Sequence, residues 1–158
     1  AQLQIHFDVH IITQNVDDLH ERAGSRKVLH LHGELLKVRS TKNPKYILEW
    51  EGDLNIGDMD SYKNQLRPHI VWFGESVPAF DEAINITETA DYFAVIGTSL
   101  QVYPAAGLIA LVPSNVPIFY VDPNPIQIPD LRNSLETFPM LATEGIPLLK
   151  NRLLAEFQ

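Results

Sequence analysis

The sequence contains no cysteine among its 158 residues. This absence excludes disulfides, thiol catalysis and thiolate zinc sites for these residues. It also suits a reducing compartment, so we expect a cytoplasmic protein.

Long apolar runs and basic clusters are missing as well. No apolar run approaches the roughly 20 residues that span a bilayer, and residues 1–6 have neither the basic region nor the apolar core of a signal peptide. The formal net charge is −8, whereas proteins that bind nucleic acid usually present a basic surface. We therefore expect no membrane partner and no direct nucleic-acid partner.

What is present is a pattern of short apolar segments that alternates between strand and helix. Strands are predicted over residues 10–13, 27–32, 69–73, 92–96 and 118–121, and helices over residues 17–23, 79–90, 104–111 and from 145 onward. This alternation predicts an α/β fold with a Rossmann-like, doubly wound parallel sheet. Such sheets bind ligands just beyond the carboxyl ends of their strands.

Polar residues follow three of the predicted strands at these ends. Gln14, Asn15 and Asp17 follow the first strand, although spacing alone favours helix capping by Asn15 or Asp17. Gly97-Thr98-Ser99 follows a later strand and could contact phosphate or ribose, with an ordinary turn as the alternative.

Two histidines, His30 and His32, end the second strand. Period-two alternation places them on one face, and a neutral imidazole there could act as a general base. A structural histidine is the favoured alternative on this pattern alone. Only the adjoining Gly33, which permits close approach of a ligand or loop, separates His32 from His30.

The eight glycines include no Gly-x-Gly pair. The fingerprint of dinucleotide-binding folds is therefore missing. If the fold is of this kind, its first strand–loop–helix unit is not in this sequence.

In order and spacing, these segments resemble the sirtuin family. Residues 13–24, TQNVDDLHERAG, are similar to the family motif TQN[IV]D-x-LH-x-x-AG, and His32-Gly33 lies where the family has its catalytic histidine. Residues 67–75, RPHIVWFGE, and 97–106, GTSLQVYPAA, resemble two further family motifs. The resemblance extends from about residue 13 to 154, and Trp72 and residues 35–39 look most like bacterial members related to the desuccinylase-type class.

The resemblance implies an NAD-dependent protein lysine deacylase. Such an enzyme removes acyl groups (acetyl, with succinyl open) from acyl-lysine proteins or peptides, with NAD as co-substrate, giving nicotinamide and O-acyl-ADP-ribose. His32 would be the general base for a ribose hydroxyl. The implied cofactor contacts are Gln14, Asn15, Val16, Asp17, Gly97, Thr98, Ser99, Asp122, Pro123, Asn124 and Ala142. The implied acyl-lysine contacts are Ile70, Val71, Trp72, Phe73 and Gly74.

Residues 35–66 depart from the family pattern. Ser40 stands where many sirtuins have the first of four zinc-binding cysteines, so we predict no structural zinc and no other metal. We expect this stretch to be a small inserted subdomain within a catalytic domain of residues 1–34 and 67–158. We expect it to be held by packing of Tyr46, Ile47, Leu48, Trp50 and Leu54, with Asp53, Asp58 and Asp60 as solvated loop carboxylates.

The family's glycine-rich loop and its acyl-selecting Tyr and Arg would precede Ala1. We therefore expect the fold to be incomplete here, lacking its first βα unit, and this chain alone to bind NAD poorly and to be inactive. Two alternatives stay open: a noncatalytic NAD- or ADP-ribose-binding module, and an interaction domain that uses residues 35–67.

Overall fold

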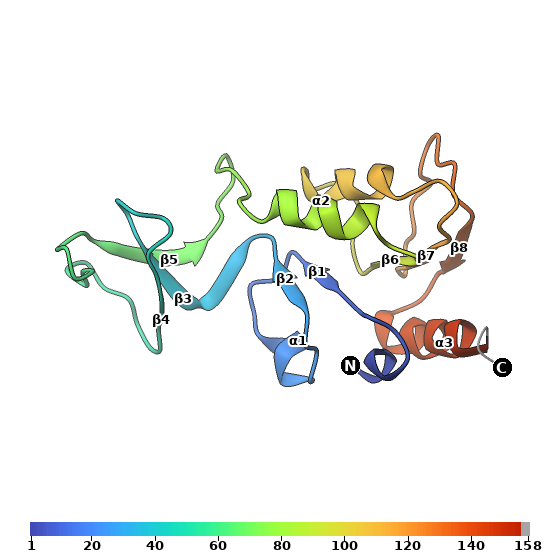
Figure 1. The fold of residues 1–158 in the computed structure, drawn as a ribbon, viewed down its shortest axis with the longest axis horizontal. Coiled ribbons are helices and arrows are strands. Elements are labelled where there is room, and N and C mark those ends of the chain that lie inside the picture. The colour runs from blue at the N-terminus through green and yellow to red at the C-terminus, as the bar shows by residue number, and fades with distance from the viewer. Residues whose placement is uncertain (156–158) are drawn as a thin grey trace. The chain divides into compact units, whose positions relative to one another are not determined.

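The computed structural model describes residues 1–155, and the chain divides into two compact units, Ala1–Ala79 and Phe80–Gln158. Each unit contains parallel strands and helices, which Figure 1 labels in chain order. The predicted α/β class with parallel sheets is confirmed. The predicted inserted subdomain stays a prediction, although strand β3 (Gly33–Ser40) crosses its proposed start. Within the described residues, no helix is long and apolar enough to cross a membrane.

The first unit begins with a short parallel pair. A 3-10 helix, η1 (Gln2–Ile5), precedes β1 (Ile11–Thr13), α1 (Leu19–Arg22) and β2 (Val28–His30). In the parallel register Thr13 lies opposite His30. The two strands therefore end at the same edge, which is where the sequence predicts polar ligand contacts.

A three-stranded antiparallel sheet follows, in the order β4-β3-β5. Besides β3 it contains β4 (Ile47–Glu49) and β5 (Leu66–Ile70). The strand predicted over residues 69–73 therefore ends three residues earlier than expected. Strand β3, which runs from Gly33 to Ser40, is not among the strands predicted from the sequence.

Asp60 organises the loops of this sheet. It is only 6% exposed, and its Oδ1 accepts hydrogen bonds from the Tyr62 and Asn64 backbone N–H groups at 2.8 and 2.9 Å. Ser40 also hydrogen-bonds its carboxylate. Burial alone would raise the pKa of Asp60, but these hydrogen bonds outweigh burial and lower the pKa to about 2.

The expected packing is therefore only part of what holds this stretch. The five side chains expected to pack, Tyr46, Ile47, Leu48, Trp50 and Leu54, are half-buried or exposed rather than buried. Asp60 is not a solvated carboxylate. It is a buried acceptor that joins Ser40 at the end of β3 to the loop that precedes β5.

Replacing Asp60 with asparagine should lower the melting temperature by several degrees, because the amide N–H groups would face the donors of Asn64 and Ser40. The carboxylate stabilises the fold above its unfolded pKa, near 3.8, and loses this effect as the pH falls toward about 2. Thermal unfolding of both proteins across this range measures the difference. Asp53→Asn, at an exposed aspartate, is the matched control and should melt like the unmodified protein; equal melting of Asp60→Asn at neutral pH would contradict this role.

The second unit is a parallel sheet with helices, in the strand order β6-β7-β8. Its elements are α2 (Phe80–Glu88), β6 (Phe93–Ile96), the 3-10 helix η2 (Ala105–Leu111), β7 (Ile118–Val121), β8 (Leu135–Phe138) and α3 (Ala142–Leu154). All four residues of β7 are buried, as expected of a central parallel strand. Strand β8 was not predicted, because its residues are mostly exposed and only partly apolar. Helix α3 begins three residues before the predicted Gly145.

Candidate functional site

The shared edge of β1 and β2 brings two predicted segments together. The Leu31 N–H donates to the Thr13 carbonyl at 2.9 Å, and the buried Thr13 hydroxyl accepts the Asn15 N–H at 3.1 Å. These bonds fix the turn of Gln14 and Asn15 beside the segment that carries His32.

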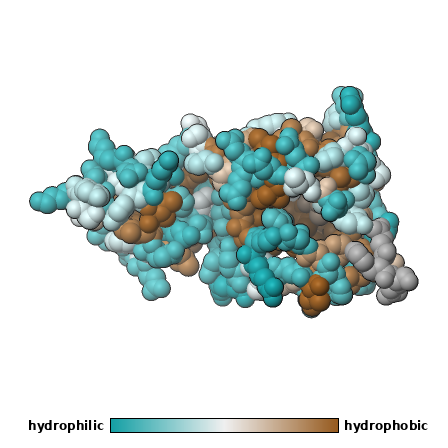
Figure 2. All heavy atoms as spheres, viewed as in Figure 1, coloured by the Kyte–Doolittle hydropathy of each residue, from teal (hydrophilic) through white to brown (hydrophobic). Residues whose placement is uncertain are grey.

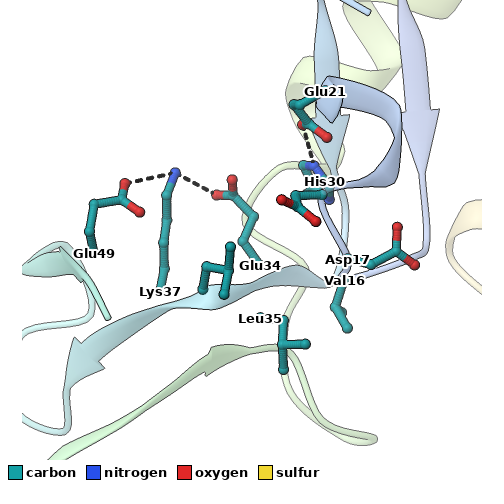
Figure 3. A pocket seen from close by; sticks show the side chains of 10 residues that line it. Val16, Asp17, Glu21, His30, Glu34, Leu35, Lys37 and Glu49 are labelled. Carbon is teal, nitrogen blue, oxygen red and sulfur yellow. Dashed lines mark hydrogen bonds and ion pairs between the residues drawn. The ribbon is translucent and has the colours of Figure 1, made fainter. Parts of the chain in front are cut away.

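His30 is a structural histidine. Its side chain is 6% exposed, and its two ring nitrogens face two acceptors: the Asn15 carbonyl at 3.0 Å and the Glu21 carboxylate at 2.8 Å. Figure 3 shows the bond to Glu21. Burial alone would lower the pKa of His30, but the hydrogen bonds to Glu21 and Asn15 outweigh it and raise the pKa. The protonated ring satisfies both acceptors, so His30 is occupied in holding the Asn15 turn.

His32 is arranged differently. Its half-buried ring has Nδ1 3.3 Å from the Gln14 carbonyl, and within residues 1–155 no hydrogen bond reaches Nε2. Because a carbonyl only accepts, the hydrogen of this bond is on Nδ1, and in the neutral ring Nε2 then carries the lone pair. The His32 carbonyl is held by the Val71 N–H at 2.9 Å. This is the tautomer and the fixed placement that a general base requires.

The His30–Glu21 pair predicts a pH dependence of stability. Because the folded-state pKa of His30 is raised, its contribution is complete below the unfolded value of 6.5 and is lost as the pH rises through the folded value. Replacing Glu21, which is 41% exposed, with glutamine should therefore lower the free energy of unfolding by about 1 kcal/mol at about pH 5.5 and by less at about pH 8.5. Urea unfolding at the two pH values, with the exposed Glu51→Gln as control, measures this; a constant difference would contradict it.

Asp17 forms a local turn bond just before α1, whose N-cap residue is Asp18. Oδ1 of Asp17 accepts the Leu19 N–H at 3.1 Å at the start of α1. Its Oδ2 has no hydrogen bond in the part of the chain that is described. One carboxylate oxygen is thus structural, and the other is open to a ligand.

Val16 and Asp17 also line a pocket of about 240 Å³, shown in Figure 3. Its other lining residues are Asp18, Glu21, His30, Glu34, Leu35, Leu36, Lys37 and Glu49. Lys37 lies between two of the carboxylates, 2.9 Å from Glu34 and 3.7 Å from Glu49. His32 is not part of its lining.

In the second unit, the predicted loops also meet at one edge. The Gly97 N–H donates to the Val121 carbonyl at 2.9 Å, so that Gly97 lies beside Asp122 where β6 and β7 end. Gly97 has φ +60, and no atom lies within 4 Å of the position that a Cβ would occupy. The buried Tyr120 hydroxyl donates to the Thr98 carbonyl at 2.9 Å.

The remaining predicted residues of this unit complete the edge. Asp122 Oδ1 accepts the Asn124 N–H at 2.8 Å, which shapes the turn through Pro123. Ser99, Pro123 and Asn124 are exposed. Ala142 is the first residue of α3, just beyond β8. The edge therefore offers an open glycine, hydroxyls and an amide to a ligand.

Comparison with known proteins identifies the family: the Sir2 family model matches residues 1–104. The chain belongs to the Sir2 (sirtuin) family. It is 58% identical over 123 residues to an NAD-dependent protein deacylase of Helicobacter pylori, covering 78% of this chain and 54% of that protein. It is 48% identical over 160 residues to an NAD-dependent protein deacylase of Bacteroides thetaiotaomicron, covering 98% of this chain and 68% of that protein.

A solved structure shares the fold of this Sir2 chain. A Sir2 homologue mutant in complex with ADP-ribose matches with a TM-score of 0.83 and 36% identity, covering 99% of this chain and 65% of that chain. The chain thus spans about half the length of the Helicobacter relative and about two thirds of this solved homologue.

The donor set of this Sir2 chain does not fit a zinc ion at Ser40. The Ser40 hydroxyl accepts the Lys42 and Asn43 N–H groups, each at 3.2 Å, and hydrogen-bonds Asp60. Within the described residues, no group of three or more His, Cys, Asp or Glu could hold a metal ion. The absence of metal from the protein stays a prediction.

Sequence reasoning missed several residues that shape the site of this Sir2 chain. Glu21 was only a motif position, yet its carboxylate lies 2.8 Å from His30 Nε2. Arg39 and Glu75 received no role, yet they form an ion pair of 3.1 Å. A signal existed for Asp60, because an aspartate followed by a polar tetrapeptide often accepts backbone N–H groups of its own turn.

Proposed function

We propose that the protein is an NAD-dependent protein lysine deacylase and that His32 is its general base. The observation that carries this proposal is the ring of His32: Nδ1 is 3.3 Å from the Gln14 carbonyl, and Nε2 is free to accept a proton. The names of the relatives and the ADP-ribose complex of the solved homologue support the assignment.

The acyl oxygen of acyl-lysine would bond to the ribose carbon of NAD and displace nicotinamide. With water, the overall reaction gives lysine, nicotinamide and O-acyl-ADP-ribose. In this reaction Nε2 of His32 takes the proton of a ribose hydroxyl, which can then bond to the acyl carbon. The Gln14 carbonyl keeps the hydrogen on Nδ1 and stabilises the imidazolium that forms. His30, with both nitrogens paired, cannot take this part.

At each of the two strand edges, taken by itself, the residues are of types that bind part of NAD. Gln14 and Asn15 contact ribose hydroxyls, and the free Oδ2 of Asp17 accepts from the nicotinamide amide, with Val16 beside it. The open backbone at Gly97 admits a phosphate, and Thr98 and Ser99 donate to phosphate and ribose. Asp122, Pro123 and Asn124 contact adenosine, and Ala142 leaves room for the adenine.

The acyl-lysine substrate binds along the segment of Ile70, Val71, Trp72, Phe73 and Gly74. Phe73 and Trp72 are 98% and 57% exposed, so they offer apolar surface to an acyl chain and exclude water from it. Acetyl and succinyl are both candidate groups. The Val71 N–H is already bonded to His32, which couples this segment to the proposed base.

The test is incubation of the full-length protein with NAD and an acetylated or succinylated lysine peptide, followed by mass spectrometry. We expect nicotinamide release that requires the peptide, with equal amounts of free lysine peptide and O-acyl-ADP-ribose. Binding of NAD without any peptide-dependent nicotinamide release would instead indicate a noncatalytic binding module and would overturn the proposal.

A further inference from the structure

A turn with two exposed aromatic side chains follows β5. The Glu75 N–H donates to the Trp72 carbonyl at 3.0 Å, and Gly74 has φ +88, a conformation that glycine adopts without strain. Trp72 and Phe73 extend from this turn and are 57% and 98% exposed. Figure 2 shows hydrophobic areas between hydrophilic ones on the face in view. Packing against these side chains does not fix the turn, because they are exposed.

The carboxylate of Glu75 fixes the turn instead. The guanidinium of Arg67 donates to both oxygens, at 2.6 Å to Oε1 and 3.3 Å to Oε2. Oε2 also accepts from Arg39 Nη2 and from the Trp72 N–H, each at 3.1 Å. One carboxylate thus joins two arginines to the backbone of the turn, and charge-assisted bonds of this kind are the stronger ones.

The register of the sheet explains why Glu75 is needed. Arg39 on β3 and Arg67 on β5 are direct partners across the antiparallel pair, and like charges at such positions repel. The side chain of Arg39 is 10% exposed, so water screens this repulsion poorly. Both arginines also donate to the Ile70 carbonyl, at 3.2 and 3.5 Å, where the strand passes into the turn.

We propose that Arg39 and Arg67, acting through Glu75, are positioning residues that hold the Trp72–Glu75 turn in the conformation that binds the acyl-lysine peptide. This inference rests on the proposed deacylase function. We call Arg39, Arg67 and Glu75 the clamp. The clamp does not touch the reacting atoms, and its effect is to order the turn before the peptide binds. Without it, the peptide must order the turn itself, which weakens binding.

The test uses full-length Glu75→Gln, which keeps the length of the side chain and removes its charge. We expect the KM for the acyl-peptide to rise about tenfold, while the KM for NAD and kcat stay unchanged. A merely destabilised protein would instead lose active molecules and show a lower kcat at an unchanged KM. Glu51→Gln, at an exposed glutamate of the same unit, is the matched control and should leave both constants unchanged.

Glu75→Gln leaves two facing cations without their anion, so a second variant separates ordering from folding. Arg39→Met combined with Glu75→Gln removes the buried cation as well, and it should fold while the turn stays unclamped. Its peptide KM should rise as in the single variant. Arg39→Lys, which keeps the charge but loses the planar fork, should raise the peptide KM by less.

A readout without catalysis tests the clamp itself. In a Trp50→Phe background Trp72 is the only tryptophan, and its fluorescence should be quenched more readily by acrylamide in both Glu75 variants. Unchanged quenching would overturn the clamp. Increased quenching with an unchanged peptide KM would overturn its role in substrate binding while leaving the deacylase proposal standing. Absence of deacylation in the unmodified protein would overturn the deacylase proposal, and with it the substrate role, whatever the quenching shows.

Discussion

Replacing His32 with alanine should lower kcat/KM for deacylation by about 10²- to 10⁴-fold, the usual contribution of a positioned general base. The variant loses Nε2, the only proposed acceptor for the ribose proton. The turn of Gln14 and Asn15 is still held by the hydrogen bonds of Thr13 to Leu31 and Asn15. Folding should be little affected, because among residues 1–155 the half-buried ring makes one hydrogen bond, 3.3 Å long. Steady-state kinetics with an acyl-peptide and NAD measure the loss.

Two histidines serve as controls for this result. His6→Ala, at an exposed position near the N-terminus, should leave both activity and stability unchanged. His30→Ala should lower the free energy of unfolding, because it leaves the Asn15 carbonyl and the Glu21 carboxylate without their donor. Full activity of His32→Ala would remove this residue from the chemistry.

Replacing Gly33 with alanine should lower the free energy of unfolding by about 3 kcal/mol or more. Gly33 has φ +85, and an added Cβ would overlap the backbone carbonyl of His69. The neighbouring atoms belong to β5 backbone and cannot move aside as a flexible side chain would. Urea unfolding measures the loss, and activity should fall with it, because the same pairing holds the His32 carbonyl at Val71.

Gly52→Ala separates the strain of the positive φ from the overlap with the His69 carbonyl. Gly52 has a similar φ of +87, but nothing lies within 4 Å of an added Cβ. Gly52→Ala should therefore lower the free energy of unfolding by the conformational strain alone, about 1 kcal/mol. Equal losses in the two variants would show that the contact with His69 does not matter.

The edges of the parallel sheets could be predicted from the sequence. Apolar runs followed by polar residues place Gly97 and Asp122 at strand ends, and the parallel register then brings them together, as the structure shows. In the same way Gln14 and His32 follow paired strands. Period-two alternation and the direction of parallel strands are local rules, so they can be applied without knowing any tertiary contact.

Other features depend on contacts that the local sequence does not contain. The alternation predicts one face for His30 and His32, and only the partners Glu21 and Asn15 identify His30 as the structural ring. The sequence predicts a strand over residues 27–32 with Gly33 next to it, whereas Gly33 is the first residue of β3 and lies opposite Ile70 of β5. Asp60 could be expected in a turn, but its burial depends on the fold of the chain around Ser40.

The most direct test of His32 as general base separates the two halves of the proposed reaction. Because the proton transfer follows the displacement of nicotinamide, His32→Ala should still exchange labelled nicotinamide into NAD when an acyl-peptide is present, while deacylation is lost. We predict that the ratio of exchange to deacylation rises by at least about 10²-fold. Parallel loss of both activities, or an unchanged ratio, would contradict the assignment of His32.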